Sequence, residues 1–205
     1  IEKARSLTQG AGDIVIASPM CIGIPNVIDS LIIVKQFVYD EKLITMQELV
    51  SALQNNWQGY EDLHSLIMKK GNFFGNDDDC SNEAANLLFA SLVQWNNTDN
   101  YLGKKWVFGN LIGYNEHHKF FGSAMKATPD GRFQGEDTNF GIGQTKGKDR
   151  SGLTALLNSI AKCDPQAVLT GPSVTNVLID EKLIKDDEHF EKSVDLFLTY
   201  FQTGG

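Results

Sequence analysis

The sequence predicts a protein of the α/β class, and three observations support this prediction. Segments with apolar residues at helical spacing alternate with short apolar runs that are typical of β-strands. The chain of 205 residues suits one large domain or two small ones and is long enough to bury a substantial core. Hydrophobic residues make up 41% and charged residues 21%, so the composition excludes disordered, collagen-like and coiled-coil proteins.

The N-terminal part is expected to hold a short helix, a short strand and then a long helix. These elements are predicted over Ile1–Leu7, Val15–Ala17 and Asn26–Tyr39, with Pro25 in the first turn of the long helix. Apolar residues cover most of the circumference of this helix. Its narrow polar stripe consists of Asp29, Gln36 and Asp40. Such a helix must be buried on most sides, which indicates that the chain belongs inside a larger body.

Capping residues and apolar spacing predict the remaining helices. The clearest signal follows Thr45, because Thr45 and Glu48 form a capping box in front of apolar residues at helical spacing. Further helices are expected over Glu61–Lys70, Ser81–Trp95, Leu153–Lys162 and Asp187–Phe201. Strands are expected over Trp106–Gly113 and Val174–Ile179, and the glycine-rich residues 122–147 are expected to be irregular.

Charge and cysteine content exclude several classes of function. The net charge of −8 argues against binding to a nucleic-acid backbone. No apolar run approaches the ~20 residues of a membrane span, and no secretory signal is visible, so we expect a cytoplasmic protein. The cysteines Cys21, Cys80 and Cys163 are widely spaced and form no CxxC pair, which argues against a disulfide scaffold or a zinc site.

Three motifs resemble functional sites but have simpler structural explanations. The segment Gly141–Lys146 lacks the third glycine of a dinucleotide-binding fingerprint. The acidic run Asp77–Asp79 suits a helix N-terminus better than a cation site. The run Glu116–His118 has adjacent histidines, which suits zinc poorly, and we expect one of the two to face an internal cavity. We therefore predict no metal site.

One stretch is more specific. Residues 127–132, Ala-Thr-Pro-Asp-Gly-Arg, place Pro, Asp and Gly in the order that a tight turn requires. The guanidinium of Arg132 can clamp carboxylates or carbonyl groups. Gly122 and Gly135 flank this stretch. These features predict a rigid, functional loop.

This hexapeptide, preceded by the pattern His118-x-x-x-Gly122, resembles the signature loop of glycyl radical enzymes related to pyruvate formate-lyase. We call residues 127–132 the signature loop. Other segments resemble the same family in the same order, namely Pro25–Val38, Glu48–Gly59, Phe74–Asp78 and Asp149–Ser159. The resemblance covers most of the chain. It implies that residues 1–205 are part of a pyruvate formate-lyase-like barrel domain, the helix-rich portion of a ten-stranded α/β barrel.

The resemblance also implies radical chemistry in a parent protein. In this family a stored glycyl radical abstracts hydrogen from a cysteine, and the resulting thiyl radical attacks a small polar substrate. The glycine motif RV.GYS and the cysteine context GC.E are both absent from this sequence, and none of its cysteines matches. We therefore assign no catalytic residue and expect the chain alone to be inactive. The parent is expected to be a homodimer whose glycyl radical is installed by an activase that uses S-adenosylmethionine and an iron–sulfur cluster.

The reaction class follows from the same resemblance. C–C, C–O and C–N cleavage all occur in the family, as in 2-ketoacid cleavage with coenzyme A (formate acetyltransferase activity), diol or hydroxyproline dehydration, choline cleavage and arylacetate decarboxylation. The spacing and sequence of the segment Pro25–Val38 and of residues 127–132 resemble the dehydratase and lyase branch more than true pyruvate formate-lyase. The alternative is a non-catalytic, stand-alone chain that acts as a binding or assembly module. This alternative predicts a monodisperse protein, whereas a fragment should expose apolar faces, beginning with the helix Asn26–Tyr39.

Individual site residues are assigned by the resemblance. The residues expected to face the substrate are Tyr114, Asn115, His117 and, at the edge of the pocket, Glu2. The residues expected to hold the signature loop together are Thr128, Pro129, Asp130, Gly131 and Arg132. Of these, Asp130 and Arg132 are predicted to be structural, because a buried arginine needs partners that offset its desolvation.

Overall fold

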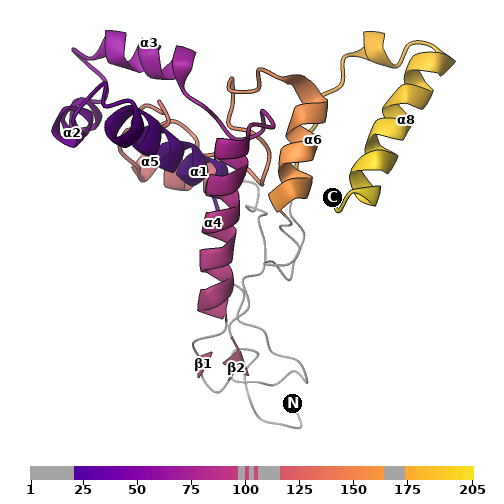
Figure 1. Ribbon diagram of the computed structural model, residues 1–205, viewed down its shortest axis with the longest axis horizontal. Coiled ribbons are helices and arrows are strands. Elements are labelled where there is room, and N and C mark those ends of the chain that lie inside the picture. Colours follow the sequence, from indigo (N-terminus) through magenta and orange to yellow (C-terminus); the bar gives the residue numbers. More distant parts are fainter. Residues whose placement is uncertain (1–20, 97–99, 102–103, 106–115, 164–173) are drawn as a thin grey trace.

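A computed structural model describes residues 21–96, 100–101, 104–105, 116–163 and 174–205 (Figure 1). The described part of the chain is mainly helical. Its β-structure is a short antiparallel pair, β1 (Asn100–Tyr101) with β2 (Lys104–Lys105). The elements predicted over Ile1–Leu7, Val15–Ala17 and Trp106–Gly113 lie outside the described residues.

The long N-terminal helix forms as predicted and lies at the centre of the fold. Helix α1 (Ile24–Ile33) begins with Pro25 in its first turn and continues into a π-helix, η2 (Val34–Asp40). The side chains of Ile28, Ile32 and Phe37 are fully buried, so one face of the helix belongs to the core. Helix α4 (Asp79–Asn96) packs against α1, and its Ala85 and Phe89 belong to the same cluster as Ile28.

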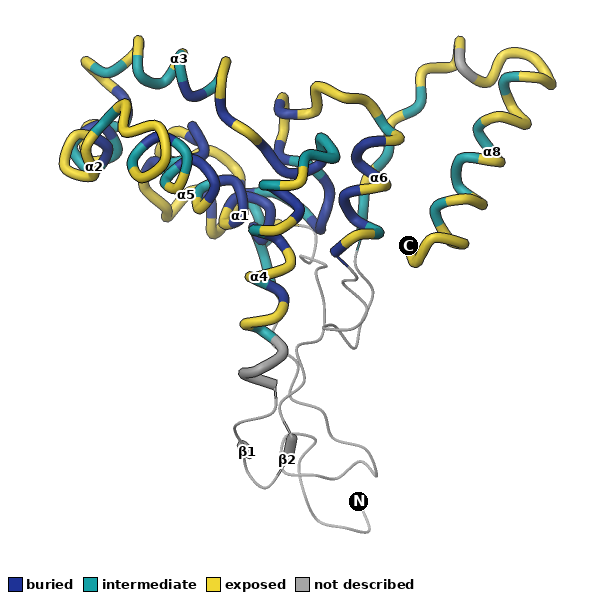
Figure 2. Tube along the Cα trace, viewed as in Figure 1, coloured by how far each residue is buried: buried dark blue, intermediate teal, exposed yellow. Residues whose placement is uncertain are grey.

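A second cluster packs around the π-helix. Helices α2 (Met46–Gln54) and α3 (Glu61–Lys70) contribute to it, and α2 begins with the predicted capping box at Thr45. The apolar members around Phe37 are Ile33, Leu49, Trp57, Ile67 and Phe73. Figure 2 shows that α1 is largely buried, whereas α2 and α3 are more exposed. The helix predicted over Glu61–Lys70 is confirmed at both ends.

The C-terminal part contains two predicted helices and one helix that the sequence prediction missed. Helix α6 (Gly152–Cys163) packs on α4, and α8 (Asp187–Gln202), which follows the short 3-10 turn η3 (Glu181–Leu183), packs on α6. Helix α5 (His117–Ala124) lies between the predicted strand Trp106–Gly113 and the start of the segment 122–147 that we expected to be irregular. No helix in the described part of the chain combines the length and apolarity needed to cross a bilayer.

The strand predicted over Val174–Ile179 is wrong. These residues form neither helix nor strand. A strand needs a neighbour to complete its hydrogen bonds. At the start of this segment the Ile142 N–H donates to the Val174 carbonyl at 2.9 Å. The run is therefore attached through its first residue and forms no sheet in the described part of the chain, and its Leu178 is 99% exposed.

Candidate functional site

The signature loop borders a cleft of about 670 Å³. Other walls come from α1, α3, α5 and the segment 137–148, so segments that are distant in sequence meet here. The polar side chains that line the cleft include Asn26, His64, His118, Asp130, Arg132 and Lys148. Met68, Phe133 and Phe140 are its apolar lining residues, and most of the others are polar or charged. We call the buried charged residues Asp130, Arg132 and Lys148 the floor of the cleft.

The signature loop is a tight turn that requires its glycine. The Thr128 N–H donates to the Arg132 carbonyl at 3.0 Å, and the Gly131 N–H donates to the Thr128 carbonyl at 3.0 Å. Gly131 has φ of +90°, a conformation that residues with a Cβ rarely adopt. A Cβ at this position would also lie 2.6 Å from the Met68 sulfur. Pro129, which fixes its own φ, occupies the first corner of the turn.

Arg132 points away from the turn and binds backbone carbonyl groups on both sides of it. Its Nη1 donates to the carbonyl oxygens of Glu136 at 2.6 Å, Phe133 at 3.1 Å and Gly122 at 3.5 Å. Its Nη2 donates to the Lys126 carbonyl at 2.5 Å. The guanidinium therefore ties the end of α5 to the residues that follow the loop, and it is almost completely buried.

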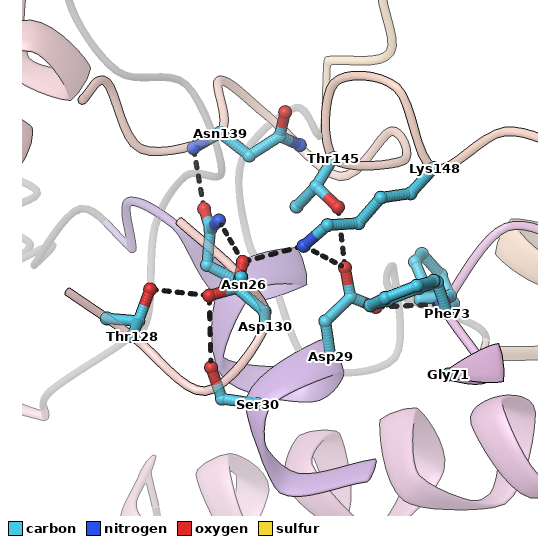
Figure 3. Close-up of polar contacts among 12 residues, drawn as sticks. Asn26, Asp29, Ser30, Gly71, Phe73, Thr128, Asp130, Asn139, Thr145 and Lys148 are labelled. Carbon is cyan, nitrogen blue, oxygen red and sulfur yellow. Dashed lines mark hydrogen bonds and ion pairs between the residues drawn. The ribbon is translucent and has the colours of Figure 1, made fainter. Parts of the chain in front are cut away.

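The Asp130 carboxylate is the centre of a buried network beneath the loop (Figure 3). It accepts hydrogen bonds from Lys148 Nζ at 2.8 Å, Asn26 Nδ2 at 2.9 Å and Thr128 Oγ1 at 2.5 Å, with Ser30 Oγ at 3.5 Å. Burial alone would raise the pKa of Asp130, but the Lys148 charge and these donors outweigh it and hold the pKa below its usual value. Asp130 is therefore a stable carboxylate at neutral pH.

A second buried carboxylate, Asp29, lies on the far side of Lys148. Asp29 Oδ2 is 3.6 Å from Lys148 Nζ and accepts a hydrogen bond from Thr145 Oγ1 at 2.6 Å. Asp29 Oδ1 accepts from the Phe74 N–H at 2.8 Å. Burial raises the pKa of Asp29 to about 6, although the Lys148 charge and both hydrogen bonds oppose this. We call Asp29, Asp130 and Lys148 the buried triad.

Asn26 links this network to the segment that follows the signature loop. Its side-chain carbonyl accepts from the Asn139 N–H at 2.7 Å, while its amide donates to Asp130. Both ends of the Asn26 amide are thus fixed by partners from different segments. Polar contacts thus join helix α1, the signature loop and residues 139–148 (Figure 3).

His64 of α3 supports the loop from the other side. Its Nε2 lies 2.8 Å from the Gly131 carbonyl, and a carbonyl can only accept, so this ring nitrogen carries the proton. The imidazole packs against Trp57 and Phe133, with ring centroids 5.2 Å and 4.7 Å away. The indole N–H of Trp57 donates to the Arg132 carbonyl at 3.4 Å. The sequence analysis had not identified His64 as a site residue.

The expected substrate-facing residues are only partly described. Glu2, Tyr114 and Asn115 lie outside the described residues. His117 is the first residue of α5 and its ring packs against Phe121, with centroids 6.2 Å apart. The cleft beside the signature loop is lined by the neighbouring His118 and not by His117. The cleft thus brings together Asp130, Gly131 and Arg132 of the predicted residues.

The other candidate motifs have structural partners. Asp78 Oδ1 accepts from the Ser81 N–H at 3.0 Å at the start of α4, as expected for a helix N-terminus. Asp77 pairs with Lys162 of α6 at 2.6 Å. Among the described residues, no group of three or more His, Cys, Asp or Glu side chains is arranged to hold a metal ion.

Comparison with known proteins places this fold and loop in a family. Residues 1–108, more than half of the chain, match the family model described as pyruvate formate lyase-like. The chain therefore belongs to the pyruvate formate lyase-like family of glycyl radical enzymes.

Three relatives illustrate the extent of the match. The chain is 29% identical over 209 residues to the trans-4-hydroxy-L-proline dehydratase of Clostridioides difficile, a match that covers 100% of this chain and 26% of that protein. The structure of the B12-independent glycerol dehydratase from Clostridium butyricum aligns with a TM-score of 0.86 at 30% identity, over 100% of this chain and 26% of that one. A glycyl radical enzyme from Archaeoglobus fulgidus aligns with a TM-score of 0.85 at 25% identity, over 99% of this chain and 26% of that one. The chain thus spans about a quarter of the length of these relatives.

Proposed function

We propose that this chain is a helix-rich portion of the ten-stranded barrel of an anaerobic, cytoplasmic glycyl radical enzyme. The parent belongs to the dehydratase and lyase branch and cleaves a C–O, C–C or C–N bond of a small polar substrate through a thiyl radical. The observation that carries the proposal is the match along the whole chain to dehydratases of this family, at about 30% identity and with closely similar structure.

The network around the signature loop supports a scaffold role for this portion. The Asp130 carboxylate and the Nη1 and Nη2 groups of Arg132 form hydrogen bonds to side chains and carbonyl groups of the fold itself. Groups bound in this way position a loop and are poorly placed to exchange protons with a substrate. For the parent we propose Tyr114, Asn115, His117 and Glu2 as the residues that contact the substrate, in place of Asp130 and Arg132.

The cysteines support the proposal that this chain lacks the thiyl-forming residue. Cys163 is buried in the core with Ile160, and burial raises its pKa to about 12. Burial also raises the pKa of Cys21 and of Cys80. A thiol that is packed in an apolar core cannot reach both a glycyl radical and a substrate. We therefore propose that the chain alone is inactive and that both radical residues belong to other segments of the parent.

Exposed apolar side chains support the placement of the chain inside a larger body. On α1, Val27 is 44% exposed and Leu31 is 51% exposed, on the face opposite the core. Leu87 on α4 is 70% exposed. In the parent barrel these faces would be covered, as the near-complete apolar circumference of α1 requires. A stand-alone binding or assembly module would instead leave these side chains in water.

Electron paramagnetic resonance tests the proposal on the intact parent. The native protein that contains this sequence would be purified without oxygen and incubated with its activase, S-adenosylmethionine and a reductant. We expect a glycyl radical signal from the parent homodimer, which a brief exposure to oxygen abolishes. The absence of a radical from protein whose activase is active on another glycyl radical enzyme would refute the proposal. The isolated 205-residue chain is the negative control.

A further inference from the structure

The buried triad has a net charge of −1 when all three side chains are ionised. Two carboxylates, Asp29 and Asp130, share a single ammonium group, that of Lys148. All three side chains are at most 5% exposed, so water cannot screen the imbalance. In a medium of low dielectric constant, one of two carboxylates that share a site is driven to take up a proton.

The hydrogen bonds show which carboxylate takes the proton. Asp130 Oδ2 accepts from the Lys148 ammonium at 2.8 Å and from the Asn26 amide. Its Oδ1 faces the hydroxyls of Thr128 and Ser30, so four donors and the nearer cation favour the ionised form of Asp130. Asp29 Oδ2 faces the Thr145 hydroxyl, 2.6 Å away, and the more distant ammonium. A hydroxyl can rotate and accept where it had donated. The Asp29–Thr145 contact is therefore satisfied with or without a proton on Asp29.

The triad also joins three segments, and two of its residues, Asp130 and Lys148, belong to the floor of the cleft. Asp29 lies on α1, Asp130 in the signature loop and Lys148 in the segment that follows it. Lys148 additionally lies over the ring of Phe73, 4.7 Å from its centroid. Any change in the charge of Asp29 therefore acts directly on the contacts that hold the signature loop against α1.

We propose that the buried triad is a proton-linked clamp: with a proton on Asp29 it holds the signature loop and residues 145–148 tightly on α1, and without that proton it holds them less tightly. The floor of the cleft then opens more readily as the pH rises through the neutral range. This inference concerns the chain itself and does not depend on the proposed radical chemistry.

The direction follows from the proton count. The pKa of Asp29 is about 6 in the closed state and 3.8 for an ordinary aspartate, so the closed state binds more protons between these two values. Opening consequently releases a proton and becomes easier with rising pH. The charged groups that act on Asp29 are Lys148 and Asp130. From α4, which packs against α1, Glu83 acts on Lys35 of the π-helix.

Hydrogen exchange of the native protein that contains this sequence, read on peptides by mass spectrometry, tests the clamp. The amides to follow are those of Phe74, which donates to Asp29, and of Gly131 and Lys148, which are bonded within the joined segments. After correction for intrinsic exchange rates, we expect their opening constant to rise about fourfold from pH 5.5 to pH 7.5. Equal opening constants at the two pH values would overturn the proposal.

Two variants separate the triad from other carboxylates. Asp29→Asn should abolish the fourfold pH dependence, because asparagine does not titrate. Asp77→Asn is the matched control: Asp77 is ionised throughout this pH range, since its pKa is lowered, first of all by the Lys162 hydrogen bond, so the dependence should remain. If the pH dependence persists in Asp29→Asn, the clamp is refuted. Should that variant fail to fold, a carbon-13 NMR titration of the unaltered protein decides, because an ordinary or lowered pKa for Asp29 would exclude the clamp.

Discussion

Arg132→Met removes the guanidinium that ties α5 to the signature loop and is expected to be the most destabilising single change in this region. Methionine keeps a similar apolar volume but donates no hydrogen bond. The variant loses two short bonds, to the Glu136 carbonyl at 2.6 Å and the Lys126 carbonyl at 2.5 Å, and two longer ones, to Phe133 and Gly122.

The expected loss in the free energy of unfolding depends on how many of these carbonyl groups can form a hydrogen bond to water instead. A hydrogen bond to a charged group contributes about 1.5–3 kcal/mol. Glu136, Phe133 and Lys126 are exposed residues, whereas Gly122 is buried and its carbonyl is harder to hydrate. Counting the two short bonds at the lower value gives about 3 kcal/mol. Arg132→Lys should recover less than half of this loss, because an ammonium group lacks the planar fork that reaches carbonyls on both sides.

Urea unfolding, followed by circular dichroism and by tryptophan fluorescence, measures this loss. The buried Trp57 is a direct reporter, because its indole N–H donates to the Arg132 carbonyl. Lys146→Met is the matched control, since this exposed cation lies at the same cleft, and it should change the free energy of unfolding by less than about 0.5 kcal/mol. A loss below about 1 kcal/mol for Arg132→Met, or one equal to the control, would refute the clamping role of Arg132.

Three further outcomes follow from the structure. Gly122→Ala should lower the free energy of unfolding by more than about 2 kcal/mol, because the new Cβ would lie 2.3 Å from a backbone carbonyl oxygen. Gly135→Ala meets no atom within 4 Å and should lower it by about 1 kcal/mol, because of the positive φ at this position. Urea midpoints compare the two variants, and equal losses would contradict the steric argument. Thr45→Ala should cost about 1 kcal/mol by removing one side of the capping box, and an unchanged midpoint would show that the cap contributes nothing. Under native conditions iodoacetamide should modify Cys80 before Cys163, which is 4% exposed, and mass spectrometry that finds the reverse order would contradict the buried placement of Cys163.

Local signals predicted the helices well because capping and spacing act within a few residues. The capping box at Thr45 and the proline at position 25 mark helix starts that the structure confirms. Helix α5 was missed because its sequence, His-His-Lys-Phe-Phe-Gly-Ser-Ala, has neither a capping side chain nor a strong apolar stripe. It is held by contacts from later in the chain, such as the Thr138 N–H bond to the His118 carbonyl at 3.1 Å.

The candidate site could be predicted only in part. The order Pro-Asp-Gly in the signature loop revealed the turn, because turn geometry is local. The partners of Asp130 could not be found in this way, since Asn26 and Lys148 are 104 and 18 residues away in sequence. One feature of the sequence did indicate a partner. Asp29 is a carboxylate in a mainly apolar stretch of helix, and a buried carboxylate needs a partner. The sequence did not indicate that Lys148 was this partner.

The central claim is that this chain functions as one part of a larger glycyl radical enzyme. Its most direct test is the mass of the native protein in the cells that produce it, measured by immunoblot and intact mass spectrometry with peptide mapping. Because the chain spans 26% of its relatives, we predict a polypeptide about four times as long, with peptides of this sequence inside it. A native product of 22.7 kDa would contradict the claim and favour a non-catalytic binding or assembly module.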